Sequence, residues 1–211
     1  MRPHLGRITG GPHVGRVGLV VLLLVVGLAD AWAADRLDEA AEAGRWLFPP
    51  ERLEVGGYVG GGLALQNYPR DGTIFVLIPR VGYVFWQQDR FLPGSLEVLV
   101  EPAYYAVHQT ETASVFSGSL ICKYNFATGT RLTPFLEGGA GVSYATRAVP
   151  EVRGSHFNFV LQAGLGLQYA VGDRNTLSLS WRYIHLSNAH LYPTDPSLNT
   201  GVFLLGFSHL F

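Results

Sequence analysis

The chain has almost no cysteine and little charge. Cys122 is the single cysteine among 211 residues, so an internal disulfide framework is excluded. Charged residues make up 15% of the sequence, well below the roughly 25% of ordinary soluble domains. The formal net charge is −1, and a chain without an excess of basic residues is not expected to bind nucleic acid. These scarcities argue against a disulfide-stapled domain and against a nucleic-acid-binding one.

The sequence also lacks an apolar run long enough to form a membrane-spanning helix. Its longest run, residues 17–28, is shorter than the roughly 20 residues that such a helix needs, which argues against an anchoring helix. The run follows a basic N-terminal segment and precedes the small residues Ala31 and Ala33, the order typical of a secretory signal peptide. We therefore expect a cleaved signal peptide over residues 1–33 and a periplasmic segment with one or two helical turns over residues 34–52.

From residue 53 onward, apolar and polar residues alternate with a period of two. This alternation predicts β-strands with one apolar and one polar face. The expected strands cover residues 54–65, 73–85, 95–107, 114–126, 132–146, 156–171, 177–188 and 198–211. Eight strands of this length form the smallest even-numbered outer-membrane architecture. We therefore predict an all-β fold, an eight-stranded antiparallel transmembrane β-barrel over residues 53–211.

The two faces of the expected strands suit a barrel in a membrane better than a soluble fold. The apolar rows are too continuous for one small core and carry aromatic residues near the strand ends, as membrane girdles do. The polar rows are expected to fill the interior, where acids and bases pair. The alternatives are a soluble β-sandwich or lipocalin-like barrel, and a narrow pore, which a filled interior disfavours. The expected interior residues are Arg80, Glu97, Glu101, Lys123, Glu137, Gln162 and Arg182.

One expected strand carries residue types that can perform acyl chemistry. In the stretch L-S-L-S-W-R-Y-I-H-L-S-N, residues 177–188, alternate positions form an apolar row of leucine, tryptophan and tyrosine. The same row continues to His185 and Ser187, which places a general base beside a potential nucleophile. Short periplasmic turns and longer external loops are usual in such barrels, and by that rule this strand runs outward. We therefore expect His185, Ser187 and Asn188 to face lipid near the outer leaflet.

The same region resembles a known enzyme family. The segment W-R-Y-I-H-L-S-N-A at residues 181–189, Pro193, the N-T-G at residues 199–201 and the closing G-F-S-H-L-F are similar to lipid A 3-O-deacylases of the PagL type. The segment F-N-F-V-L-Q-A-G-L-G-L-Q-Y at residues 157–169 is similar to them as well. The resemblance implies an outer-membrane carboxylic ester hydrolase that cleaves the ester at the 3-position of lipid A. Its implied partners are lipopolysaccharide and outer-membrane lipids, with no metal and no cofactor.

The resemblance also implies a role for each residue of the motif. Ser187 is the expected nucleophile, His185 the general base, and Asn188 a donor to the oxyanion. The chain departs from the family at Asn199, which stands near the position of the family's catalytic glutamate. An amide oxygen can accept a hydrogen bond from imidazole and fix its tautomer, but it has no full charge to stabilise the imidazolium. Asp195, four residues earlier, is the alternative acid.

Several alternatives remain open at this level. One is a non-catalytic structural or adhesive outer-membrane barrel that retains the motif. The sequence does not decide between Asn199 and Asp195 as the partner of His185. It also leaves open which acyl ester is cleaved and whether the chain forms a homodimer.

Overall fold

The computed structural model describes residues 48–65, 72–151, 154–194 and 196–211. The predicted signal peptide and most of the predicted periplasmic segment, including its expected helical turns, lie outside the described residues. Within the described ranges, no helix is both long enough and apolar enough to cross a membrane.

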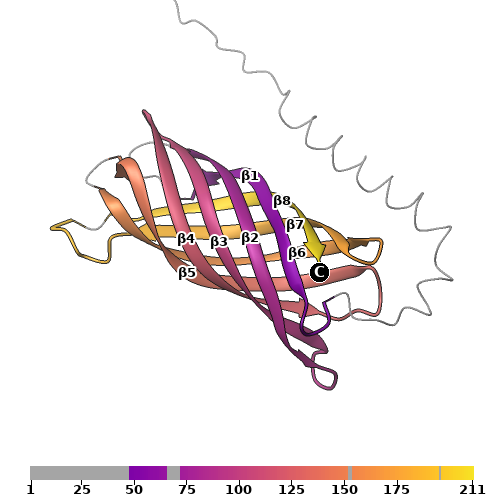
Figure 1. Cartoon of the computed structure of the whole chain (residues 1–211). Helices are drawn as coiled ribbons and strands as arrows, with labels where there is room; N and C mark the ends of the chain where they lie inside the picture. The colour runs from indigo at the N-terminus through magenta and orange to yellow at the C-terminus, as the bar shows by residue number, and fades with distance from the viewer. Residues whose placement is uncertain (1–47, 66–71, 152–153, 195) are drawn as a thin grey trace, which may run out of the picture. The chain divides into compact units, whose positions relative to one another are not determined.

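Eight β-strands follow one another and close into a single barrel (Figure 1). Each strand pairs antiparallel with its neighbours in sequence, and β1 pairs with β8 to complete the ring. The strands are β1 (Leu53–Ala64), β2 (Thr73–Gln88), β3 (Gly94–His108), β4 (Thr112–Phe126), β5 (Leu132–Val149), β6 (Ser155–Val171), β7 (Asn175–Ser187) and β8 (Leu198–Leu210). The prediction of an all-β, eight-stranded antiparallel barrel is confirmed.

The strand bounds differ from the predicted ones mainly at the hairpin ends. β2 continues to Gln88, beyond the predicted end at residue 85, because Gln88 still pairs with Gly94 of β3. β5 continues to Val149, which pairs with Ser155 of β6. A backbone ladder depends on N–H and C=O groups rather than on side-chain polarity. It therefore extends past the last alternating residue.

The apolar row of each strand forms the outer face of the barrel. On β7, Leu177 and Leu179 are exposed, whereas Ser178 and Ser180 are buried. The other strands show the same alternation, and their exposed positions carry leucine, valine and aromatic side chains. A continuous apolar surface of this extent is unfavourable in water and suits contact with lipid chains.

Charged side chains fill the middle of the barrel. All of the predicted interior residues are buried, together with Glu54, which the sequence pattern did not single out. Arg182 binds two carboxylates, with Nη1 2.6 Å from Glu101 Oε2 and Nη2 2.8 Å from Glu137 Oε1. Lys123 Nζ lies 3.1 Å from Glu54 Oε2. Buried charges must pair, because an isolated charge away from water is strongly disfavoured. The predicted ionic filling is confirmed.

The interior side chains change from charged to apolar toward the end of the barrel where β7 finishes, which we call the distal end. The inward side chains of β7 there are Ile184 and Leu186, and both are buried. They belong to an apolar cluster that also includes Val160 of β6 and Val202 of β8. The predicted polar interior therefore covers only part of the barrel. At the distal end, packed apolar side chains support the outer faces of β7 and β8.

Candidate functional site

The predicted nucleophile and base lie on the outer face of β7 at its distal end. Strand alternation places His185 and Ser187 on the same side as the lipid-facing Trp181. Ile184 precedes His185, and Leu186 lies between His185 and Ser187. Both side chains point into the apolar cluster. Alternation is fixed by local strand geometry, and the apolar filling beneath the strand holds that orientation.

His185 is hydrogen-bonded to Asn199 on the neighbouring strand. The two residues lie directly opposite each other in the ladder between β7 and β8. Nδ1 of His185 is 2.6 Å from Oδ1 of Asn199. Because an amide oxygen only accepts, the imidazole donates from Nδ1 and keeps a lone pair on Nε2. This is the tautomer that a general base presents to a nucleophile.

A second donor, which the sequence analysis did not single out, reaches the same oxygen. The Tyr183 hydroxyl donates to Oδ1 of Asn199 at 2.5 Å. Tyr183 lies opposite Gly201, so it approaches Asn199 diagonally, over a distance that an aromatic side chain can span. The sequence did indicate that Tyr183 lies on the same face as His185, two residues before it. It did not indicate the register between β7 and β8, which brings Tyr183 to Asn199.

Asn199 is shielded although it lies on the outer face of β8. Its exposed fraction is 6%. A Cβ atom at the neighbouring outward position, Gly201, would lie 3.2 Å from Trp181 Nε1 and 3.4 Å from Leu65 Cδ2. The missing side chain therefore allows Trp181 and Leu65 to lie close over this part of β8. Hydrogen bonds screened from water in this way are electrostatically stronger.

Ser187 is a neighbour of His185 on β7 and lies opposite Phe159 of β6. Among the described residues, the structure records no hydrogen bond between Ser187 Oγ and the imidazole. The Cα atoms of residues i and i+2 on a strand are roughly 7 Å apart, so the two side chains can meet by rotamer changes. Catalytic hydrogen bonds are often long without substrate and shorten when it binds.

The prediction that Asn188 faces lipid is wrong. Its side chain is 1% exposed, and Nδ2 donates to the carbonyl of Thr194 at 2.9 Å. The alternation ends because the chain turns after Ser187, at Ala189 and His190, which adopt φ angles of 51° and 61°. Positive φ is uncommon outside glycine, and such strain concentrates at functional sites.

Two other expectations concern acids and metals. Asp195, the alternative acid, lies outside the described residues. In the part of the chain that the structure describes, no group of three or more histidine, cysteine, aspartate or glutamate residues is arranged to hold a metal ion.

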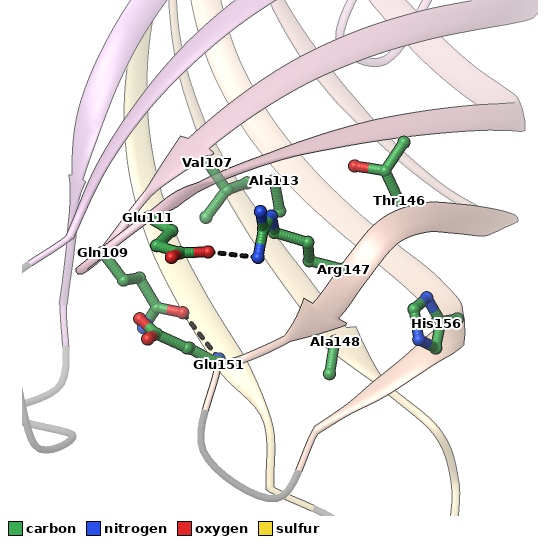
Figure 2. A pocket seen from close by; sticks show the side chains of 9 residues that line it. All are labelled: Val107, Gln109, Glu111, Ala113, Thr146, Arg147, Ala148, Glu151 and His156. Atoms are coloured by element: carbon green, nitrogen blue, oxygen red, sulfur yellow. Dashed lines mark hydrogen bonds and ion pairs between the residues drawn. The ribbon is translucent and has the colours of Figure 1, made fainter.

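A cavity of about 320 Å³ lies at the distal ends of β3 to β6 (Figure 2). Arg147 forms an ion pair with Glu111 there, and the N–H of Glu151 donates to Gln109 Oε1 at 2.8 Å. The residues that line the cavity are Val107, Gln109, Glu111, Ala113, Thr146, Arg147, Ala148, Glu151 and His156. None of the predicted site residues belongs to this lining. His185 and Ser187 lie instead on the outer face of β7.

Two solved structures are similar to the chain. The crystal structure of the outer membrane enzyme PagL is 22% identical over 72% of this chain and 97% of that chain, with a TM-score of 0.57. The crystal structure of Neisserial surface protein A is 17% identical over 76% of this chain and 97% of that chain, with a TM-score of 0.56. At these identities, both comparisons show the fold alone. No curated protein is significantly similar to the chain.

A family model gives the more specific result. The model described as lipid A 3-O-deacylase (PagL) matches residues 54–208, which run from the start of β1 into the end of β8. The match includes the whole motif at residues 181–189 and confirms the resemblance inferred from it. Together with the apolar outer face, it places the chain in the bacterial outer membrane. The chain belongs to the PagL family of lipid A 3-O-deacylases.

Proposed function

We propose that the chain is an active esterase that removes the acyl chain linked to the 3-position of lipid A. In this proposal Ser187 is the nucleophile, His185 is the general base and Asn199 orients His185. The observation that carries it is the 2.6 Å hydrogen bond from His185 Nδ1 to Asn199 Oδ1, on the same outer face as Ser187. That bond leaves Nε2 of His185 ready to accept a proton.

The reaction begins at the carbonyl carbon of the ester. Oγ of Ser187 attacks this carbon while Nε2 of His185 accepts the serine proton. The tetrahedral intermediate then expels the sugar oxygen, which takes the proton from the imidazolium, and the acyl group remains on Ser187. A water molecule deprotonated by Nε2 attacks the acyl-enzyme, releases the fatty acid and restores the serine hydroxyl.

Asn199 provides orientation without formal charge. Its oxygen accepts the Nδ1 hydrogen when the imidazole is neutral and when it is protonated, so the ring keeps one orientation through both steps. An amide dipole stabilises the imidazolium less than a carboxylate does. The expected enzyme therefore works more slowly than one with a carboxylate at this position.

The oxyanion of the intermediate requires N–H donors close to Ser187. Asn188, the residue directly after Ser187, remains the proposed side-chain donor, through its amide nitrogen. The backbone N–H of Ala189 in the turn after β7 is the other proposed donor. Donors held by a constrained turn need little reorganisation when the negative charge develops.

The location on the outer wall suits a lipid substrate. Phe159 and Leu161 of β6 lie opposite Ser187 and His185, and both side chains are exposed on the outer face. An acyl chain lying along this surface brings its ester to Ser187 while its tail remains in the bilayer. Leaving the bilayer would cost about 0.8 kcal/mol for each CH₂ group, so cleavage in place avoids a large penalty.

Mass spectrometry of lipid A from cells with and without the protein tests the proposal. Cells with the wild type should contain lipid A that lacks one acyl chain, and cells with Ser187→Ala should contain only fully acylated lipid A. Ser114→Ala is the matched control, because Ser114 is a partly buried serine at the distal end of β4 that contacts Tyr104. All variants lose a single hydroxyl and should assemble normally.

Two results would count against the proposal in different ways. Deacylation by Ser187→Ala would refute the assigned nucleophile. An assembled wild type that leaves lipid A unchanged would favour the alternative of a structural or adhesive barrel that retains the motif.

A further inference from the structure

Two donors converge on a single amide oxygen beside the proposed base. The Tyr183 hydroxyl lies 2.5 Å and His185 Nδ1 lies 2.6 Å from Asn199 Oδ1. Among the described residues, this oxygen is the sole hydrogen-bond partner of the Tyr183 hydroxyl. Tyr183 lies on the lipid-facing row, where water is scarce and a polar hydrogen needs a protein partner.

An asparagine amide has two orientations that exchange its oxygen and nitrogen. With the oxygen toward His185, the imidazole donates from Nδ1 and Nε2 keeps its lone pair. With the nitrogen toward His185, the amide donates to Nδ1, the ring hydrogen resides on Nε2, and Nε2 can no longer accept the Ser187 proton. Only the first orientation gives a working base. A carboxylate has no such requirement, because both of its oxygens accept.

We propose that Tyr183 is a positioning residue that holds the oxygen of Asn199 toward His185 and so sets the imidazole tautomer. This inference rests on the proposed function and adds a residue outside the proposed triad. If the amide were reversed, its nitrogen would face Tyr183 as well as His185, and the phenol hydrogen would lose its acceptor. An unsatisfied donor in an apolar environment is costly. The reversed orientation is therefore disfavoured as long as the hydroxyl is present.

The packing around Tyr183 supports this role. Gly201 lies opposite Tyr183 on β8, and Trp181 and Leu65 lie close over that glycine. These apolar groups limit the approach of water that could replace Asn199 as an acceptor for the hydroxyl. The proposed role of Tyr183 also follows from the asparagine at position 199, where the family has a glutamate. One of the two orientations of an amide must be selected, whereas a carboxylate needs no such selection.

Tyr183→Phe tests the inference, because it removes the hydroxyl and keeps the ring. For lipid A hydrolysis in detergent micelles, kcat should fall about five- to tenfold, the effect of one hydrogen bond. KM should stay unchanged, because the hydroxyl does not touch the substrate. In the Asn199→Asp background, the same substitution should leave kcat unchanged, because either carboxylate oxygen can accept from His185. Tyr104→Phe is the control, since it removes a hydroxyl that contacts Ser114 instead.

Nitrogen NMR of the His185 ring in the same micelles gives a readout that does not depend on catalysis. The wild type should show the hydrogen on Nδ1, and Tyr183→Phe should shift the population toward the form with the hydrogen on Nε2. His185→Gln identifies the resonances that belong to this residue.

Two results would overturn the inference. One is an equal loss of kcat in both backgrounds, because a packing defect would then explain it. The other is an unchanged kcat and tautomer in Tyr183→Phe while Ser187→Ala abolishes activity, which would leave the proposed function intact. If the wild type cleaves no lipid A, the proposed function has failed. The tautomer measurement then decides the role of Tyr183 by itself.

Discussion

Replacing Asn199 with alanine removes the acceptor of two hydrogen bonds, from Tyr183 and from His185. The bond from His185 becomes charge-assisted when the imidazole takes the proton of Ser187 in the transition state. A hydrogen bond to a charged group contributes about 1.5–3 kcal/mol, and each ~1.4 kcal/mol changes a rate by a factor of ten. Asn199→Ala is therefore expected to lower kcat/KM by about 10- to 150-fold.

Asn199→Glu is expected to act in the opposite direction. A carboxylate accepts the same hydrogen bond and adds a full negative charge beside the imidazolium. Removing the orienting carboxylate from a serine-protease triad lowers turnover about 10⁴-fold, which sets an upper bound on the gain. The 2.6 Å contact between His185 and Asn199 leaves little room for the extra methylene of glutamate. We therefore expect the rate to rise by much less than this bound.

The assay is the initial rate of fatty acid release from lipid A in detergent micelles by purified variants. Asn175→Ala is a matched control, because Asn175 Oδ1 lies 2.8 Å from His209 Nδ1 at the other end of the β7–β8 pair, and its rate should equal that of the wild type. Asp195→Ala tests the alternative acid. If Asp195→Ala abolishes activity and Asn199→Ala does not, Asp195 is the partner of His185. If neither changes the rate while Ser187→Ala abolishes it, the site is a Ser–His dyad and the reasoning about Asn199 is wrong.

Two further predictions concern the barrel itself. Deleting Phe211 should lower the heat-modifiable fraction on gels, because its N–H hydrogen-bonds to β1 and helps to close the barrel; equal assembly would contradict this. Arg182→Leu leaves Glu101 and Glu137 without their shortest ion pairs and should reduce the free energy of unfolding in urea by about 3–5 kcal/mol. Arg147→Leu removes an exposed ion pair and should cost less than about 1 kcal/mol, so similar losses for the two arginine variants would refute the argument.

Sequence alternation was sufficient to place the proposed nucleophile and base. The face on which a side chain lies depends only on local strand geometry, so His185 and Ser187 were correctly placed on the outer wall. The same rule identified Arg182 and its partners as interior residues. The match to the motif added Asn199, which the register between β7 and β8 then placed opposite His185.

The errors and omissions arose where local geometry no longer decides the outcome. Asn188 follows the last residue of β7, and the positive φ angles after it turn the chain away from the alternating pattern. Tyr183 meets Asn199 only through the cross-strand register, which a single strand does not encode. The apolar distal interior around Ile184 and Leu186 depends on which side chains eight strands bring together. The polarity of one row could not show this.

The position of Ser187 and His185 on the convex outer wall determines how the proposed esterase meets its substrate. Encounters occur by lateral diffusion within one leaflet, so the rate should depend on the mole fraction of lipid A at the surface rather than on its bulk concentration. Diluting lipid A with a second lipid should slow the reaction at constant total lipid A. The released fatty acid stays in the same leaflet, where it competes for the apolar surface around Phe159 and Leu161. Product inhibition should therefore follow the composition of the membrane rather than the volume of the compartment.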